Sequence, residues 1–358
     1  MQAVPVIALT GYLGAGKTTL LNHVLRSPLA RIGVVINDFG ELNVDAALVT
    51  GQVDEPASIA GGCICCLPDD GGLDVALARL ADPELRLDAI IVEASGLADP
   101  VAISRIIRFS GVDNVRPGGV VDVLDAATHF DTVDRDPAPP ARYGAATLVV
   151  VNKLDQVADG DRTAALQRIE NRVRECNPHA QVVGATAGRI DPALLYDVSV
   201  TGEETGQLTF RELLFDTENV TPHAGDHDHV HADSVTVVGD GCVDPGAVID
   251  VLEHPPAGVY RIKGTIAVRY RNTTRVYVVN VVGPSVHIAI APGGIAPGGI
   301  APKGVAPSGT NANCLVAIGM GLDTDQVRDR LRSALAPVSG VASAQGVRRL
   351  QRYRRLSI

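Results

Sequence analysis

The segment Gly11–Thr19 constrains this chain more than any other, because it fits the pattern G-x-x-x-x-G-K-[ST] in full. It follows an apolar run, Val4–Leu9, and opens a helical pattern, Lys17–Arg26. A strand, a glycine-rich turn and a helix in this order surround a phosphate with backbone N–H groups and a helix N-terminus. The pattern therefore predicts a phosphate-binding loop.

The residues of this loop have separate candidate roles. Contacts to the nucleotide are expected from Gly11, Gly14, Ala15, Gly16, Lys17, Thr18 and Thr19. Lys17 is expected to reach the β and γ phosphates and to assist catalysis there, and the Thr18 hydroxyl to hold Mg²⁺. The alternative, a chance glycine-rich turn, fits the flanking strand and helix poorly.

Short runs rich in Val and Ile alternate with helical patterns up to about residue 187. The expected strands are Val4–Leu9, Ile32–Asn37, Ala89–Ala94, Gly119–Leu124, Thr147–Asn152 and Gln181–Gly184. The expected helices are Lys17–Arg26, Leu73–Leu80, Val101–Phe109 and Asp161–Cys176. Nearly continuous apolar strands are typical of parallel strands covered on both faces. Residues 1–200 are therefore predicted to form an α/β domain with a doubly wound, mostly parallel sheet.

The pattern changes after residue 200. Residues 201–233 are polar and are expected to be a His-rich linker, and residues 234–358 a second, smaller α+β domain. Its expected strands are Val235–Val238, Tyr260–Ile262, Thr265–Tyr270, Arg275–Val282 and Leu315–Gly319, and its expected helices are Pro245–Leu252 and Thr324–Leu335.

Four Pro/Gly pentapeptides fill residues 290–309, which cannot sustain a helix or a central strand. The basic tail carries Arg348, Arg349, Arg352, Arg354 and Arg355, and such runs are mostly solvated.

Composition narrows the class of protein. Lys plus Arg number 31 and Asp plus Glu 41, so the net charge of −10 argues against a general nucleic-acid-binding protein. No stretch approaches about 18 uninterrupted apolar residues, and the N-terminus has neither a basic start nor a cleavage site. We therefore expect no membrane span, no secretory signal, and a cytoplasmic location in which cysteines stay reduced.

A second nucleotide motif, Asn152-Lys153-Leu154-Asp155, follows the strand that ends at Asn152. The Asp155 carboxylate can accept both the ring N1–H and the 2-amino group of guanine, which adenine does not offer together. Asn152, Lys153 and Asp155 are therefore candidate guanine-binding residues. The alternative is an ordinary polar strand end.

Two further segments supply candidate residues near the nucleotide. Glu93 ends an apolar strand and is expected to contact Mg²⁺ through water or to position the attacking water, and Gly96 to offer its N–H to the γ-phosphate. Asp38 and Glu41 follow the second strand and are candidate oxygen ligands for a metal ion. Solvated loop acids are the alternative for each carboxylate.

Gly61-Gly62-Cys63-Ile64-Cys65-Cys66 predicts a site for a soft metal ion such as Zn²⁺ or Co²⁺. In an extended segment Cys63 and Cys65 point the same way and form the favoured chelating pair, and Cys66 joins them if the backbone turns. Two or three ligands leave the site open, which suits transfer of the ion better than permanent binding. Cys176, Cys242 and Cys314 are expected to be buried apolar cysteines instead.

The expected linker repeats histidine at alternate positions, His227, His229 and His231, with His223 before them. These side chains are candidate auxiliary metal ligands that gather ions from solvent. An accidental polar linker is the alternative.

Taken together, these motifs resemble the CobW family of P-loop GTPases, kin to the urease- and hydrogenase-maturation GTPases. The resemblance rests on Gly11–Thr19, Asn37–Asp45, Cys63–Cys66, Glu93–Pro100 and Asn152–Asp155, and it continues through the linker to Tyr260–Gly264. It implies a metallochaperone that uses GTP and Mg²⁺ to deliver Zn²⁺ or Co²⁺ to a client metalloprotein or a cobalt chelatase. A nucleotide-dependent homodimer is a further expectation.

Three alternatives to this reading stay open at the level of the sequence. One is a nitrile hydratase activator of the same family. Another is a non-catalytic metal buffer or sensor in which GTP only sets the affinity for metal. The third, a nucleotide kinase, is disfavoured by Asn152–Asp155 and Cys63–Cys66.

Overall fold

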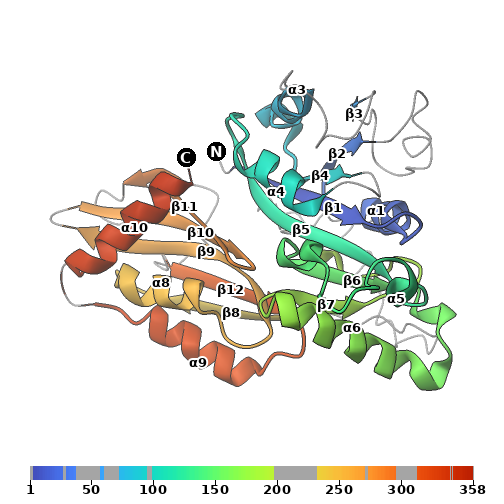
Figure 1. Cartoon of the computed structure of the whole chain (residues 1–358). Coiled ribbons are helices and arrows are strands. Elements are labelled where there is room, and N and C mark those ends of the chain that lie inside the picture. The colour runs from blue at the N-terminus through green and yellow to red at the C-terminus, as the bar shows by residue number, and fades with distance from the viewer. Residues whose placement is uncertain are drawn as a thin grey trace, which may run out of the picture.

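A computed structural model of the chain describes residues 3–26, 30–37, 57–59, 72–94, 99–196, 232–270, 273–295, 313–338, 340 and 342–357. Two β-sheets organise these residues, and helices pack against each of them (Figure 1). The first sheet carries the predicted phosphate loop, and the second sheet follows it in the chain.

The first sheet has seven parallel strands in the order β3-β2-β4-β1-β5-β6-β7. They are β1 (Val4–Gly11), β2 (Ile32–Asn37), β3 (Ala57–Ile59), β4 (Ala89–Glu93), β5 (Val115–Asp125), β6 (Leu148–Asn152) and β7 (Gln181–Gly184). From β1 the chain forms β2 and β3 on one side, returns to place β4 between β2 and β1, and then adds β5, β6 and β7 on the other side of β1. The predicted doubly wound α/β class is therefore confirmed. The sequence-based prediction missed β3 and started β5 at Gly119 instead of Val115.

Helices cover both faces of this sheet (Figure 1). They are α1 (Lys17–Leu25), α3 (Gly72–Leu80), α4 (Pro100–Arg108), α5 (His129–Thr132) and α6 (Arg162–Cys176). Short 3₁₀ turns join them: η2 (Pro83–Leu85), η3 (Ala141–Gly144), η4 (Leu154–Gln156), η5 (Asp159–Asp161) and η6 (Pro192–Leu194). No helix within the described ranges of the chain is long and apolar enough to cross a membrane.

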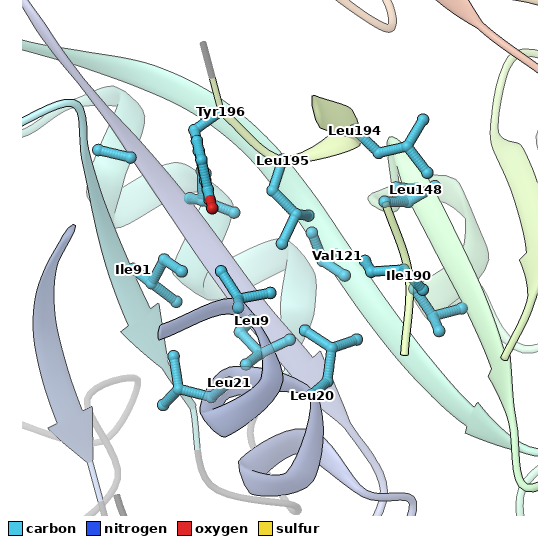
Figure 2. Close-up of a cluster of buried hydrophobic side chains, with 14 of the residues drawn as sticks. Leu9, Leu20, Leu21, Ile91, Val121, Leu148, Ile190, Leu194, Leu195 and Tyr196 are labelled. Carbon is cyan, nitrogen blue, oxygen red and sulfur yellow. The ribbon is translucent and has the colours of Figure 1, made fainter. Parts of the chain in front are cut away.

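Alternate residues of the strands enter different cores, as expected for strands buried on both faces. On β1, Ile7 and Leu9 pack on the side of α1, whereas Val6 and Ala8 pack on the side of α3 and α4. The segment after η6 also belongs to the α1 side. Figure 2 shows Leu195 and Tyr196 in the same cluster as Leu9, so this segment forms part of the first domain's core.

The second sheet is antiparallel, with strand order β11-β10-β9-β12-β8. Its strands are β8 (Asp233–Gly239), β9 (Val259–Tyr270), β10 (Thr273–Val282), β11 (Ser285–Ile295) and β12 (Asn313–Gly319). Three helices, α8 (Pro245–Glu253), α9 (Thr324–Ala334) and α10 (Ala344–Leu356), pack on one face of it (Figure 1). The expected α+β class of the second domain is confirmed.

Three details of this domain differ from the prediction. The strands expected on either side of Gly264 are one continuous strand, β9. The glycine in its middle is required by the neighbouring strand, because a Cβ at Gly264 would lie 1.8 Å from Cys314 O of β12. The unpredicted β11 runs into the first pentapeptide through Pro292. It lies at the sheet edge, where a proline removes no hydrogen bond from a central ladder.

The third difference is the basic tail, which forms the helix α10. Val347 and Leu350 are buried against the sheet, and Arg349 pairs with Asp250 at 2.6 Å and Glu253 at 2.7 Å on α8. The expectation of a solvated run is therefore wrong for Arg349, because helix formation turns it toward α8.

The two domains share part of one core. Tyr260 of β9 meets Thr147 through their hydroxyl groups at 3.2 Å, and Val282 belongs to the same buried cluster as α1. A second contact joins the Ala232 N–H to the Asp191 carboxylate at 2.9 Å. The second domain therefore contacts both the beginning of β6 and the segment that follows β7.

His287 of β11 gives the fold a dependence on pH. Burial, with Arg116 nearby, lowers the pKa of His287 from 6.5 to about 4. A depressed histidine pKa contributes stability that is complete above pH 6.5 and is lost as the pH falls toward 4. Between pH 7 and pH 4 we expect the free energy of unfolding to fall in the unsubstituted chain by up to roughly 3 kcal/mol more than in His287→Gln, because glutamine does not titrate. Urea unfolding at the two pH values measures this, and equal losses in both proteins would contradict it.

Candidate functional site

The site begins at the glycines between β1 and α1. Gly14 and Gly16 have positive φ angles of +75° and +102°, a left-handed backbone that lets the loop curve tightly between β1 and α1. A Cβ on Gly11 would meet Val123 O at 2.5 Å, so the loop also needs a glycine where it leaves the sheet. These glycines open directly into the N-terminus of α1 at Lys17, an arrangement that suits an anion.

Lys17 lies over this loop with a side chain that is almost fully buried. Its ammonium donates to Gly11 O at 3.0 Å and to Tyr12 O at 3.4 Å. The positive charge is therefore held at the mouth of the loop, where phosphate oxygens are expected to enter.

Thr18 and Glu93 come together although they are far apart in the sequence. The Thr18 hydroxyl donates to Glu93 Oε1 at 3.0 Å, and the Glu93 side chain is 2% exposed at the end of β4. A hydroxyl beside a carboxylate at a phosphate loop is a donor set of the kind Mg²⁺ prefers. The structure thus places two residues that the sequence predicted independently in one position suited to the ion.

Asn152 connects three parts of the site. Its amide nitrogen donates to Ala15 O in the phosphate loop at 2.9 Å, and its amide oxygen accepts from Gly188 N–H at 2.9 Å. The side chain is 1% exposed. Asn152 therefore braces the phosphate loop against the turn after β7.

That turn, Thr186–Arg189, is part of the site that the sequence-based prediction missed. Ala187 and Gly188 both have positive φ, and a Cβ on Gly188 would meet Leu20 N at 2.6 Å. The turn thus packs closely on α1 as well as on Asn152. The signal available in the sequence was a glycine shortly after a parallel strand, at the edge where the other motifs lie.

Lys153 and Asp155 follow β6 in the 3₁₀ turn η4. Lys153 has φ +61° and directs its ammonium to Asp125 Oδ2 at 2.8 Å, whereas Asp155 is exposed. Arg162 steadies this turn by donating to Leu154 O at 2.9 Å and Val157 O at 3.2 Å. The two residues of the motif thus have separate surroundings, one paired and one open to solvent.

Several predicted residues fall outside the residues that the structure describes. They are Asp38, Glu41, Cys63, Cys65, Cys66, Gly96, His227, His229 and His231. Within the described ranges, no group of three or more His, Cys, Asp or Glu side chains is arranged to hold a metal ion. The expected cysteine ligands therefore stay a prediction.

The other three cysteines are less buried than predicted. Cys242 and Cys314 are half-buried, and burial raises the pKa of the Cys314 thiol. Cys176 is exposed, so the expectation that it is buried is wrong. It is the last residue of α6, beyond the buried positions Ile169 and Val173 that face the core.

Comparison with known proteins places the two domains in families. The model described as CobW/HypB/UreG, nucleotide-binding domain, matches residues 5–184. The model described as Cobalamin synthesis protein cobW C-terminal domain matches residues 232–335.

Individual relatives agree with these matches. Zinc chaperone CobW of Sinorhizobium sp is 30% identical over 73% of this chain and 80% of that protein. Zinc chaperone YjiA of Escherichia coli is 30% identical over 56% of this chain and 63% of that protein. Zinc-regulated GTPase metalloprotein activator 1 of Dictyostelium discoideum is 26% identical over 63% of this chain and 51% of its own length, so this chain spans about half of it. The chain belongs to the CobW/HypB/UreG family of P-loop GTPases.

Proposed function

We propose that this chain is a GTP-dependent metallochaperone that binds Zn²⁺ or Co²⁺ at Cys63, Cys65 and Cys66 and delivers the ion to a client protein on GTP hydrolysis. One observation carries the proposal. All strands of the first sheet are parallel, so the chain leaves each of them at one edge. The nucleotide residues and the expected metal ligands both follow strand ends at that edge.

Chain connectivity limits how far the expected ligands lie from the sheet. Asp38 comes directly after β2, and Cys63 comes four residues after Ile59, the end of β3. Four residues span at most roughly 14 Å. Ile59 is paired with Asn37, whose strand is in turn paired with β4, which ends at Glu93. A metal site at Cys63 would therefore lie near enough to sense the γ-phosphate through the intervening segments.

The nucleotide site supplies the switch in this proposal. Lys17 would stabilise the β and γ phosphates, and Thr18 together with Glu93 would hold Mg²⁺ directly or through water. Gly96 follows Glu93 by three residues and would offer its N–H to the γ-phosphate. Loss of that phosphate on hydrolysis removes the contact, which is how such segments are released in GTPases.

Guanine selectivity would come from Asp155. Its carboxylate is exposed just beyond the carboxyl end of β6, and it would accept the N1–H and the 2-amino group of the base. Asn152 and Lys153 would shape the same subsite, Asn152 by holding Ala15 and Gly188 in place.

The names of the relatives favour zinc as the ion, because the two bacterial relatives described above are both named zinc chaperones. The client would be a metalloprotein whose own thiolate or imidazole ligands take over the ion, or a cobalt chelatase. Activation of a nitrile hydratase would be the same chemistry with a different client. In the cytoplasm the cysteine thiols would stay reduced and available to the ion.

The proposal requires that GTP and metal strengthen each other's binding. Titrating Zn²⁺ and Co²⁺ into the GDP-bound protein and into the protein bound to a non-hydrolysable GTP analogue measures this coupling. We expect affinity for the ion to be roughly 5- to 150-fold higher with the GTP analogue, and affinity for the analogue to rise by the same factor with metal. Because thiolates bind the ion, the affinity should also fall as the pH drops below about 8.5.

Cys63→Ala and Cys65→Ala are expected to remove both the tight metal site and the coupling. Cys176→Ala is the matched control, since Cys176 is an exposed cysteine outside the motif. Equal metal affinity in the two nucleotide states would reject the chaperone and favour a metal buffer, which donates its ion regardless of hydrolysis.

A further inference from the structure

Asp125, at the end of β5, uses its two carboxylate oxygens for different purposes. Oδ1 accepts from the backbone N–H groups of Ala127 at 2.9 Å and Thr128 at 3.3 Å, which closes the turn after the strand. Oδ2 accepts from the Lys153 ammonium at 2.8 Å. Oδ1 therefore stabilises the turn after β5, and Oδ2 binds the ammonium of Lys153, a residue of the predicted guanine motif.

The sheet brings this pair together. Asp125 and Asn152 are register partners in β5 and β6, and Ala126 N–H donates to Asn152 O at 2.9 Å. Lys153 is thus the first residue beyond the paired strands, and its positive φ turns it back toward β5. The side chains of Asp125 and Lys153 are 15% and 26% exposed, so solvent screens the pair only in part.

The carboxylate of Asp125 is well suited to stay ionised. Burial disfavours its charge, but the hydrogen bonds from Lys153, Ala127 and Thr128 outweigh burial and hold its pKa below 3.8. The ion pair with Lys153 therefore persists through the neutral pH range.

Asp155 has the opposite surroundings. It is two residues after Lys153 in the same turn, and it is exposed. Within the described part of the chain its carboxylate has no hydrogen bond or ion pair, and only its backbone oxygen accepts, from Arg162 at 3.5 Å. A lysine carries its charge on a long flexible stem and pairs with whichever carboxylate is within reach. Without Asp125, the nearest carboxylate along the motif would be Asp155.

We propose that Asp125 is a positioning residue that keeps the Lys153 ammonium away from Asp155, so that the Asp155 carboxylate stays available to the N1–H and 2-amino groups of guanine. This inference rests on the proposed guanine-binding role of Asp155. It assigns to β5 a part in base selectivity, although Asp125 lies outside the Asn152–Asp155 motif.

Asp125→Asn tests the charge alone, because the amide oxygen of asparagine can still accept from Ala127 and Thr128. Affinities for GDP and inosine diphosphate, which lacks the 2-amino group, are measured on the full chain by calorimetry. We expect Asp125→Asn to weaken GDP binding by about tenfold and to bring the GDP-to-inosine diphosphate affinity ratio close to one. Asp325→Asn is the matched control, since it removes an aspartate paired with an arginine at 2.6 Å on α9 in the other domain.

Removing the lysine charge distinguishes positioning from a structural role. Lys153→Met keeps an apolar stem of similar length and has no ammonium for Asp125 to hold away from Asp155. Asp125→Asn/Lys153→Met is therefore expected to have the same GDP-to-inosine diphosphate affinity ratio as Lys153→Met alone, since both variants lose whatever Lys153 itself contributes to the guanine subsite. An unchanged ratio in Asp125→Asn would overturn the inference, as would a ratio in the double variant that is lower than in Lys153→Met.

Asp155→Asn separates this inference from the role on which it rests. If Asp155→Asn collapses the ratio while Asp125→Asn leaves it intact, only the positioning role of Asp125 is wrong. If Asp155→Asn leaves the ratio unchanged, the guanine-binding role of Asp155 fails, and the inference fails with it.

Discussion

Lys17→Ala is expected to abolish measurable binding of Mg²⁺–GTP while the chain stays folded. Lys17 is the first residue of α1, and its ammonium lies 3.0 Å from Gly11 O at the mouth of the phosphate loop. Hydrogen bonds from a charged donor contribute about 1.5–3 kcal/mol each. Loss of two such bonds to phosphate oxygens corresponds to a fall in affinity of at least about a hundredfold.

Calorimetric titration with Mg²⁺–GTP measures this loss, and a thermal melt verifies that the variant is folded. Lys303→Ala, in the pentapeptide repeat, provides a lysine control outside the nucleotide domain. If Lys17→Ala bound Mg²⁺–GTP within tenfold of the unsubstituted chain, the assignment of this lysine to the phosphates would be wrong.

Gly16→Ala is expected to damage both nucleotide binding and stability. Gly16 has φ +102°, and a Cβ there would lie 2.2 Å from the Asn152 amide nitrogen. A left-handed backbone costs an alanine about 1–2 kcal/mol, and each buried hydrogen bond broken at Asn152 costs about 1–3 kcal/mol more. We expect a loss of roughly 3 kcal/mol in the free energy of unfolding and at least about a hundredfold in GTP affinity.

Gly14→Ala isolates the part of this effect that comes from Asn152. Gly14 also has positive φ, at +75°, but no atom lies within 4 Å of the Cβ position. Its substitution should therefore cost only the backbone term of about 1–2 kcal/mol. Urea unfolding and nucleotide titration of both variants make the comparison. Equal losses would show that the contact between residue 16 and Asn152 contributes nothing.

Much of the first domain was predictable from its sequence because its strands are buried on both faces. Runs such as Ile32–Asn37 and Ala89–Glu93 are apolar at almost every position. They can therefore be predicted as strands without knowing which strands lie beside them. The edge strand β11 and the helix α10 were less visible. Proline and glycine mask β11, and α10 has few apolar residues among its arginines. Both elements form because of contacts with the second sheet, which β11 extends and α10 covers, and such contacts are not visible in the local sequence.

The candidate site was predictable to the extent that it follows local motifs. The phosphate loop and the acid at the end of β4 were expected, and the structure brings Thr18 and Glu93 within 3.0 Å of each other. Their roles at Mg²⁺ or at the attacking water stay predictions. The turn Thr186–Arg189 and the pairing of Lys153 with Asp125 depend on the register of β5, β6 and β7. No local pattern encodes that register, so these parts of the site required the structure.

The core that Tyr260 and Val282 share with the first domain links the stability of the two halves of the molecule. Opening the second domain exposes apolar surface of the first, so the two tend to unfold as one cooperative unit. A ligand that binds only the native state stabilises every region that must open together with its site. Nucleotide bound beside α1 would thereby also suppress unfolding of β9 and β10, and thermodynamic protection would extend to strands that make no contact with the ligand.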